Sequence, residues 1–338
     1  MDDMRQRVPS SPQSNEKENL SQQYGGIHAG TWVDRLPHFW IPYVQLSRLS
    51  PPVALFLIYL PHLFGILHAA TVYKKLPAQI LLSSVVLLGG SLFFSNAAHA
   101  WNDLIDAPID KRIARTKNRP IARGTITSRA ALIFTASQAV VAASFLLWLP
   151  ASTSIATVPT ILGTTYYPWS KRHTYFPQVV LGFCLAWGTI VGCAAMGADK
   201  PWKDQSSLCL VLVSTFWTMI FDTIYAYQDI EDDIKVGVKS TAVLFGSHTK
   251  IFLWICLTLM SVSMFMYGYL AALGIGYYVV TLSGCIISLG TMIARVDLSN
   301  EASCWWWFTS DFWFTGASIA GGLLLEYVVH QHSTGFMF

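Results

Sequence analysis

The chain alternates between long stretches without charged residues and short segments in which charged residues gather. Residues 130–170 and 251–294 contain no Asp, Glu, Lys or Arg, and each stretch is longer than 40 residues. A helix that crosses the hydrocarbon core of a bilayer needs about 20 residues, so each stretch can form two spans joined by a tight turn. The other uncharged stretches are residues 51–73, 76–102, 174–198, 205–221 and 312–325. Together, these stretches predict about nine transmembrane helices.

The composition agrees with a membrane location. Only 12% of the residues are charged, 53% are hydrophobic, and the mean hydropathy is +0.44. A soluble domain carries about 25% charged residues, and a disordered chain has far fewer apolar ones, so both classes are excluded. In lipid, only helices or a closed barrel satisfy the backbone, and these stretches are too long for barrel strands of about ten residues. We therefore expect an all-α fold, a polytopic membrane helical bundle.

The two ends of the chain differ from this pattern. Residues 1–30 are polar and predict a disordered tail, whereas residues 31–50 combine aromatic and basic side chains, as an interfacial helix does. The transmembrane domain should cover residues 51–331, followed by a tail at 332–338. The acidic start has the features of neither a secretory signal nor a transit peptide.

The basic residues predict an orientation in the membrane. With nine spans, 18 of the 22 Lys and Arg residues lie on the same side as the N-terminus. The positive-inside rule places that side in the cytosol.

Cysteine and histidine give no sign of a metal or disulfide framework. The six cysteines form no CxxC pair, and the nine histidines form no HExxH pattern. Small, buried apolar side chains are the simpler explanation for the cysteines.

Two acidic clusters lie at the ends of predicted spans and hold eight of the 19 carboxylates. Charged residues are costly at such positions and are usually functional. Within each cluster, two aspartates are four residues apart and can share a helix face. Like charges at this spacing repel each other, so a cation should lie between them. The clusters are Asn102, Asp103, Asp106 and Asp110, and then Asp222, Asp229, Glu231, Asp232 and Asp233.

Oxygen ligands without Cys or His suit Mg²⁺, which binds through one or two carboxylates together with substrate phosphates. Bases that could hold such phosphates follow both clusters and the fourth predicted span. An isolated pair of aspartates is more often a pair of solvent-exposed loop charges. Two such pairs on the same side of the membrane, each followed by bases, indicate a binding site for a diphosphate that is held by metal ions. The bases are Lys111, Arg112, Arg115, Lys117, Arg119, Arg123, Lys171, Arg172, Lys235 and Lys239.

Two other membrane functions use acidic residues. A secondary transporter would place its carboxylates near the bilayer midplane, whereas these lie at helix ends. A phospholipid-forming alcohol phosphotransferase would carry its aspartates in one compact motif, whereas Asp110 and Asp229 are 119 residues apart. Both functions are therefore disfavoured, and a soluble terpene synthase is excluded by the spans.

Three segments resemble signatures of the UbiA family of intramembrane prenyltransferases. Residues 102–127 (NDLIDAPIDKRIARTKNRPIARGTIT) resemble the motif NDxxDxxxD followed by RTxNRP. Residues 222–246 resemble the second acidic signature, and residues 166–178 (YYPWSKRHTYFPQ) resemble the connecting YPxxKR loop. The three occur in the expected order, and the resemblance covers roughly residues 35–330. The closest subgroups are the 4-hydroxybenzoate polyprenyltransferases and the fungal enzymes that prenylate aromatic polyketides.

The resemblance implies a bundle of nine transmembrane helices around a central cavity, a prenyl diphosphate donor and Mg²⁺. By matching position, it implies catalytic roles for Asp106, Asp110, Asp229 and Asp233, which would hold the metal with Asn102 and Asp103. Asp103 belongs to the motif but would lie behind the ligands. The diphosphate would be bound by Arg48, Arg115, Lys171 and Arg172, whereas Asn118 and Arg119 match a structural part of the motif.

The acceptor of such an enzyme is an electron-rich aromatic ring that attacks the ionised prenyl group. Asp222 or the released pyrophosphate is a candidate for the final base. One interpretation is transfer of a farnesyl-like group to a phenolic polyketide at the endoplasmic reticulum, giving a meroterpenoid. The alternative is ubiquinone synthesis from 4-hydroxybenzoate at the mitochondrial inner membrane. The absence of a transit-peptide pattern and the sequence Ser50-Pro51-Pro52, where the family carries charge, favour the first interpretation. No nucleic acid and no obligate protein partner is expected.

Overall fold

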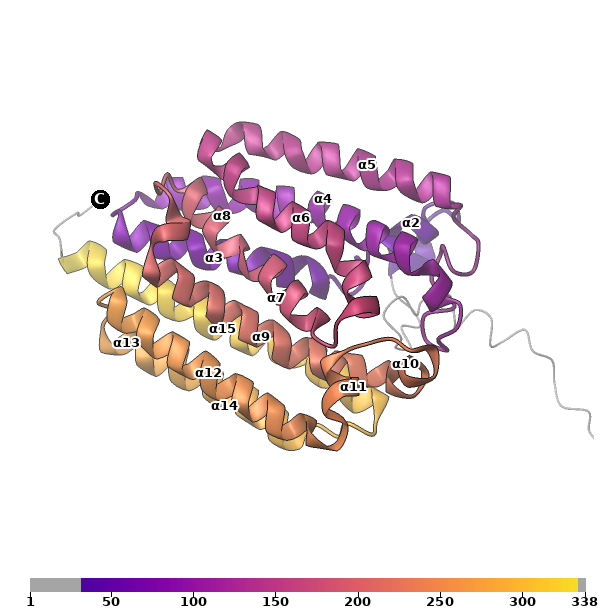
Figure 1. The fold of residues 1–338 in the computed structure, drawn as a ribbon. Coiled ribbons are helices and arrows are strands. Elements are labelled where there is room, and N and C mark those ends of the chain that lie inside the picture. The colour runs from indigo at the N-terminus through magenta and orange to yellow at the C-terminus, as the bar shows by residue number, and fades with distance from the viewer. Residues whose placement is uncertain (1–31, 334–338) are drawn as a thin grey trace, which may run out of the picture.

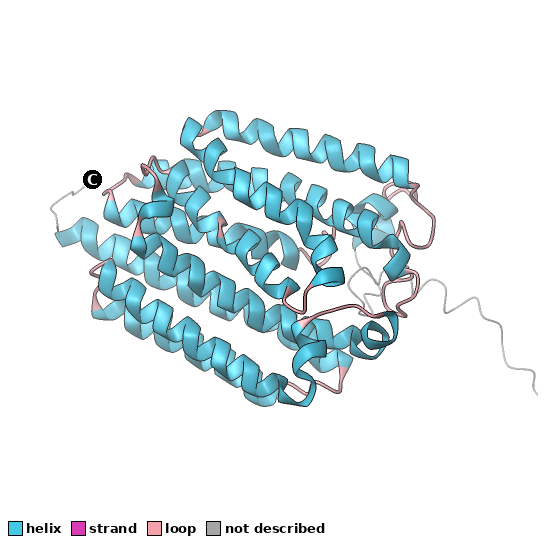
Figure 2. Cartoon of the chain, in the orientation of Figure 1, coloured by secondary structure: helices cyan, strands magenta, loops and turns pink. Residues whose placement is uncertain are grey.

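The computed structural model describes residues 32–333, and within this range it contains helices and loops but no strand (Figure 2). The two tails predicted from the sequence lie outside the described residues, except that residues 332 and 333 form the end of the last helix. The helices are η1 (Trp32–Arg35), α2 (Ile41–Leu46), α3 (Val53–Val72), α4 (Pro77–Asp110), α5 (Ser128–Phe145), η2 (Leu146–Trp148), α6 (Ala151–His173), α7 (Pro177–Ala186), α8 (Gly188–Ala195), η3 (Pro201–Lys203), α9 (Gln205–Ala226), η4 (Tyr227–Asp229), α10 (Ile230–Val236), α11 (Thr241–Phe245), η5 (Gly246–His248), α12 (Thr249–Leu270), α13 (Ile275–Tyr277), η6 (Tyr278–Leu282, a π-helical turn), α14 (Ser283–Arg295) and α15 (Glu301–Ser333).

The long helices lie side by side along one common direction (Figure 1). The short helices α2, α10 and α11 gather at one end of the bundle, and α15 finishes at the other end. Within the described chain, eight helical segments are long and apolar enough to cross a membrane, and they run from Val53–Val72 to Glu301–Gln331. The expectation of an all-α polytopic membrane bundle is therefore confirmed.

Helix α6 explains the difference between these eight spans and the nine expected. Its 23 residues are enough to cross a bilayer, but it carries many Ser and Thr side chains and is absent from the eight. It packs against α4, α7 and α8, and its Thr160 and Thr164 line cavities inside the bundle. A helix that faces a cavity can carry polar side chains that lipid would not tolerate.

Helix α3 lies in the interior, where it contacts α4, α8, α9 and α15. Small residues allow its close approach to α8, as is usual between membrane helices. A Cβ atom added at Gly65 would lie 1.9 Å from the carbonyl oxygen of Thr189, and one added at Gly192 would lie 2.1 Å from that of His62. Helix α5, by contrast, buries almost none of its surface, as expected for a helix that faces lipid.

The segment predicted as one interfacial helix, residues 31–50, contains two short helices, η1 and α2. Trp32, Phe39 and Trp40 are 50%, 67% and 52% exposed. Exposed aromatic rings are typical of the membrane–water interface. The position of this segment at the interface remains a prediction.

Candidate active site

The first acidic cluster occupies the last turns of α4. Because an α-helix has 3.6 residues per turn, its polar side chains, three or four residues apart, follow one side of the helix. Asp103, Asp106 and Asp110 are only 2%, 1% and 4% exposed. Burying three carboxylates so closely requires compensating cations, and the chain supplies these from the loop that follows and from α6.

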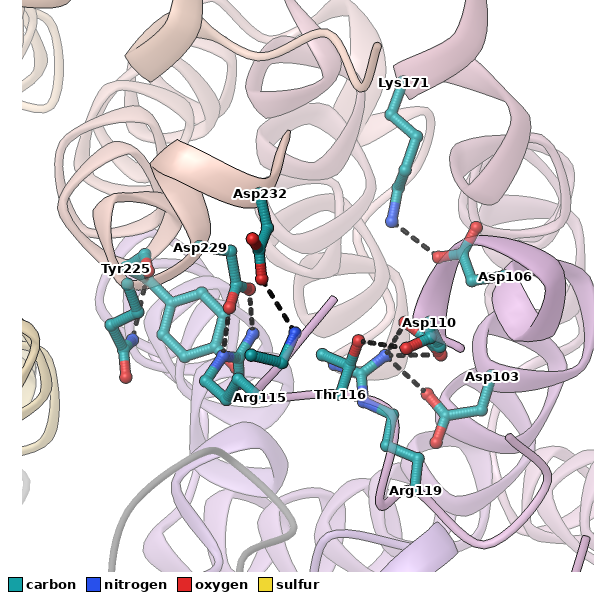
Figure 3. A network of polar contacts seen from close by, with 12 residues as sticks. Asp103, Asp106, Asp110, Arg115, Thr116, Arg119, Lys171, Tyr225, Asp229 and Asp232 are labelled. Carbon is teal, nitrogen blue, oxygen red and sulfur yellow. Dashed lines mark hydrogen bonds and ion pairs between the residues drawn. The ribbon is translucent and has the colours of Figure 1, made fainter. Parts of the chain in front are cut away.

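The second acidic cluster lies where α9 ends. The chain continues from α9 through the 3₁₀ turn η4 into α10, so that Asp229 ends η4 and Asp233 lies in α10. Gly237 ends α10 with a φ of +83°, a backbone conformation that glycine adopts without strain. The two clusters face each other across the loop of residues 111–127 (Figure 3).

Arg115 ties this loop to the second cluster. Its Nε donates to Asp229 Oδ1 at 2.8 Å and its Nη2 to Oδ2 at 2.5 Å, while Nη1 donates to the Tyr225 hydroxyl at 2.9 Å. Burial lowers the pKa of Arg115, but the charge of Asp229 and the bonds to it outweigh burial and raise that pKa. The backbone N–H of Ala114 also donates to Asp232 Oδ2, at 2.8 Å. Arg115 is therefore a permanent cation held rigidly between the clusters.

Arg119 connects the same loop to the first cluster. Its Nη1 lies 3.2 Å from Asp103 Oδ1 and 3.0 Å from Asp110 Oδ2. Burial lowers the pKa of Arg119, but these carboxylates more than offset the effect and raise it well above its ordinary value. Asp103 also accepts from Arg48 Nη2 at 2.7 Å. Asp103 therefore lies between two guanidinium groups.

Asp106 is paired with the end of α6. Lys171 Nζ donates to Asp106 Oδ2 at 2.5 Å (Figure 3). Arg172 Nη1 lies 3.6 Å from Asp106 Oδ1. Arg172 also donates to the carbonyl oxygens of Pro168 and Ile105. These bonds fix the end of α6 against α4, and they place Lys171 beside the first cluster.

A cavity of about 230 Å³ opens between the two clusters. Of the residues predicted for the site, Asp103, Asp106 and Arg172 do not line this cavity. Asp103 pairs with Arg48 and Arg119, and Asp106 pairs with Lys171, and all three of these bases line it. Asp222, the candidate base, also lines it. The predicted ligands and bases that line it are Arg48, Asn102, Asp110, Arg115, Lys171, Asp229 and Asp233.

A second cavity, of about 340 Å³, adjoins the first between α4, α5 and α6. Among the described residues that line this apolar cavity, none is Asp, Glu, Lys or Arg. The shared lining residues mark the passage between the two cavities. They are His62, Phe94, Ala98, Thr160 and Thr164.

The oxygen atoms in and directly behind the wall of the charged cavity suit Mg²⁺. Asn102 Oδ1 and Asp106 Oδ1 are one helical turn apart and buried, and neither accepts a hydrogen bond from the described residues. Within residues 32–333, no three Asp, Glu, His or Cys side chains form a ready-made metal cluster. Mg²⁺ does not need one, because it keeps several waters and uses one or two carboxylates beside substrate phosphates. The side chains therefore fit this ion. The ligand roles stay a prediction.

Two features of the site are not predicted by the sequence motifs. The resemblance assigns Arg119 to a structural part of the motif, but Arg119 lines the charged cavity and joins two of the three carboxylates of the first cluster, Asp103 and Asp110, to the loop. The histidines were compared only with a metal-binding pattern, whereas His62 lies inside an uncharged apolar stretch, where a polar ring is costly and suggests function. That signal is visible in the sequence.

Comparison with known proteins agrees with this geometry. Residues 58–317 match the model of the UbiA prenyltransferase family. The mitochondrial 4-hydroxybenzoate polyprenyltransferase of Saccharomyces cerevisiae is 35% identical, over 89% of this chain and 80% of its own length. The UbiA prenyltransferase claS of Ampulloclitocybe clavipes is also 35% identical, over 85% of this chain and 91% of its own length.

A solved structure shares the fold. The UbiA homolog from Archaeoglobus fulgidus bound to GPP and Mg²⁺ is 19% identical, and it superposes with a TM-score of 0.65 over 84% of this chain and 99% of its own. The family model covers most of the chain, and the two relatives cover 89% and 85% of it. The chain therefore belongs to the UbiA prenyltransferase family.

Proposed function

We propose that this prenyltransferase moves a prenyl group of about farnesyl length from its diphosphate to a phenolic, polyketide-type aromatic acceptor. The observation that carries the proposal is the junction of two unlike cavities, one lined by carboxylates and bases and the other without charge. A prenyl diphosphate has the same two parts, an anionic head and an apolar tail. The charged cavity therefore suits the head and the apolar cavity suits the tail.

The diphosphate would be bound by the bases that line the charged cavity. Arg48, Arg115, Arg119 and Lys171 converge there from three separate parts of the chain. Asn102, Asp106 and Asp110 on one side, with Asp229 and Asp233 on the other, would hold Mg²⁺. The bound ion would neutralise charge on the leaving pyrophosphate, and the UbiA homolog from Archaeoglobus fulgidus is described as bound to GPP and Mg²⁺.

The residues around the reacting carbon would protect a carbocation. When the allylic C–O bond breaks, both electrons leave with the pyrophosphate and the prenyl carbon becomes positive. The rings of Tyr167, Phe221, Tyr225 and Phe308 line the cavity, where they would exclude water and stabilise the cation through their π electrons. The acceptor ring then forms the new C–C bond, and its displaced proton passes to Asp222 or to the pyrophosphate.

The proposal also names the aromatic acceptor and the membrane in which the protein lies. Relatives of equal identity carry the names of a 4-hydroxybenzoate polyprenyltransferase and of a fungal UbiA prenyltransferase. We favour a phenolic polyketide and meroterpenoid synthesis at the endoplasmic reticulum, with the N-terminus in the cytosol. The alternative is 4-hydroxybenzoate at the mitochondrial inner membrane, and the mitochondrial relative supports it.

One assay separates these alternatives. Membranes that contain the protein are incubated with farnesyl diphosphate, Mg²⁺ and either a 5-alkylresorcinol or 4-hydroxybenzoate, and prenylated products are identified by mass spectrometry. We expect prenylated resorcinol in the wild type and almost none in Asp106→Ala or Asp233→Ala. Product from 4-hydroxybenzoate alone would reverse the acceptor assignment. Full activity in either variant would contradict the metal assignment.

A further inference from the structure

His62 occupies the passage between the two cavities. It lies in the middle of α3 and lines both cavities, together with Phe94 and Ala98 of α4 and Thr160 of α6. Among the described residues that line the apolar cavity, it is the only one with an ionisable side chain. A polar ring in the interior of a membrane bundle is costly, so its position at this passage calls for a function.

The surroundings of the ring fix its orientation. Nδ1 lies 2.9 Å from the carbonyl oxygen of Ile58, and because a carbonyl only accepts, Nδ1 carries a proton and donates. The same edge of the ring faces α8, since a Cβ atom added at Gly188 would lie 3.0 Å from both Nδ1 and Cε1. Nε2 follows Cε1 in the ring, and the His62 side chain lines both cavities.

Nε2 is available as a hydrogen-bond acceptor. The described residues form no hydrogen bond to it, and none of their carboxylates makes an ion pair with His62. A charged imidazolium at this position would be buried without compensation. The neutral ring, with its proton on Nδ1, therefore presents the Nε2 lone pair to whatever enters the passage.

The charges around the cavities define what this lone pair can bind. If the acceptor carried a carboxylate that pointed into the apolar cavity, that carboxylate would need a cation beside it. The bases line only the charged cavity; they are Arg48, Arg115, Arg119, Lys171 and Lys239. The group that Nε2 can bind is an O–H or N–H donor without charge. For an electron-rich aromatic ring beside the prenyl carbon, that donor is a phenolic hydroxyl.

We infer that His62 Nε2 accepts a hydrogen bond from a phenolic hydroxyl of the acceptor, and that the acceptor is an uncharged phenol of the resorcinol type. The inference rests on the proposed prenyl transfer and names its acceptor class. The structural basis is a ring that is held through Nδ1 by Ile58 and has no hydrogen-bond partner on Nε2 among the described residues. The ring lies where the charged cavity meets an apolar cavity that no Lys or Arg of the described chain lines.

This bond also promotes the reaction. As the ring's π electrons form the new C–C bond, positive charge spreads onto the phenolic oxygen and makes its O–H a stronger donor. The bond to Nε2 is then stronger in the transition state than in the bound phenol, which raises kcat. The hydroxyl keeps its proton throughout. The proton that leaves is the one on the substituted ring carbon, and its departure restores the aromatic ring.

Two variants of His62 test the inference with 5-pentylresorcinol as the acceptor. In His62→Asn, the amide can still donate to Ile58 but no acceptor reaches the place of Nε2, whereas the longer side chain in His62→Gln can put an amide oxygen there. We expect His62→Asn to lower kcat/KM for the resorcinol about tenfold, mostly through kcat, and His62→Gln to recover most of the loss. KM for farnesyl diphosphate should stay near the wild-type value in both.

His68→Asn is the matched control, because His68 is a buried histidine of the same helix that lines neither cavity and instead bonds to Tyr267. The His68→Asn protein that elutes as a folded species in size-exclusion chromatography in detergent should keep the wild-type kcat/KM. If His62→Asn stays within twofold of the wild type, or both His62 variants lose activity equally, the inference is overturned. Wild-type transfer to 4-hydroxybenzoate alone would overturn the acceptor class but leave prenyl transfer intact. No product and no pyrophosphate release with any acceptor would refute the proposed function itself.

Discussion

Arg115 bridges the loop of residues 111–127 and the second acidic cluster, so the substitution Arg115→Lys is a sharp test of the site. The guanidinium donates two parallel hydrogen bonds to Asp229 and another to the hydroxyl of Tyr225. A lysine keeps the positive charge but offers a single ammonium group on a flexible stem. The variant therefore changes geometry and leaves the net charge of the cavity unaltered.

The magnitude follows from the bonds that are lost. A lysine can retain one bond to Asp229, and it loses the second bond to that carboxylate and the bond to Tyr225. A hydrogen bond that involves a charged group contributes about 1.5–3 kcal/mol, and the charged guanidinium donates both of the lost bonds. Because the two side chains of the ion pair are only 8% and 11% exposed, solvent screens them little. A loss of about 3 kcal/mol corresponds to a decrease in kcat/KM of about 100-fold.

The assay is the initial rate of prenyl transfer by purified protein in detergent, measured at varied donor concentration. Arg112→Lys is the matched control, because Arg112 is an exposed residue of the same loop, and it should keep the wild-type rate. If Arg115→Lys retains more than half of the wild-type kcat/KM while Arg112→Lys keeps the wild-type rate, the guanidinium does not position the diphosphate.

Three further substitutions test other parts of the structure. The bond from His68 and those from two serines lower the pKa of Asp204 despite its partial burial, and its Oδ2 caps α9 by accepting from the Ser207 N–H at 2.8 Å. Asp204→Ala should therefore reduce the free energy of unfolding at pH 7 by about 1 kcal/mol. The stabilisation by Asp204 is complete above the ordinary pKa of 3.8 and is lost as pH falls through the lowered pKa, so the thermal midpoints of variant and wild type should converge in acid. A difference between the two midpoints that persists in acid would contradict this role of Asp204. Phe145→Ala enlarges the apolar cavity that Phe145 lines, and the ratio of kcat/KM for geranylgeranyl over farnesyl diphosphate should rise about tenfold; an unchanged ratio would mean that the tail lies elsewhere. Gly192→Ala would place a methyl group 2.1 Å from the carbonyl oxygen of His62 and should destabilise the bundle by about 2 kcal/mol, whereas an unaltered thermal midpoint would show that α3 and α8 can separate freely.

The uncharged stretches predicted the helices well because every span that faces lipid needs about 20 apolar residues without charge. The stretch at residues 51–73 corresponds to α3, and the two halves of residues 130–170 correspond to α5 and α6. The rule fails where a helix faces the protein interior. Helix α6 is more polar than a lipid-facing helix because it borders two cavities, and neither cavity can be located from sequence.

The site was predictable only in part, for the same physical reason. Helical spacing shows that Asp103, Asp106 and Asp110 lie near one another, but it does not show how α4 is rotated in the bundle. That rotation turns Asp110 toward the cavity and buries Asp103 and Asp106 against bases. The pairing of Asp106 with Lys171, 65 residues away, likewise depends on how α4 and α6 pack.

The central claim is that the charged cavity binds a prenyl diphosphate with the help of Mg²⁺. Its most direct test is the equilibrium binding of an unreactive donor analogue, farnesyl S-thiolodiphosphate, to the protein in lipid nanodiscs by calorimetry. We predict that removing Mg²⁺ or introducing Asp106→Asn together with Asp229→Asn weakens binding about 100-fold. Asp204→Asn, near the start of α9 and away from both acidic clusters, should not weaken it. Equal affinity in the wild type and the double variant, with or without Mg²⁺, would contradict the account.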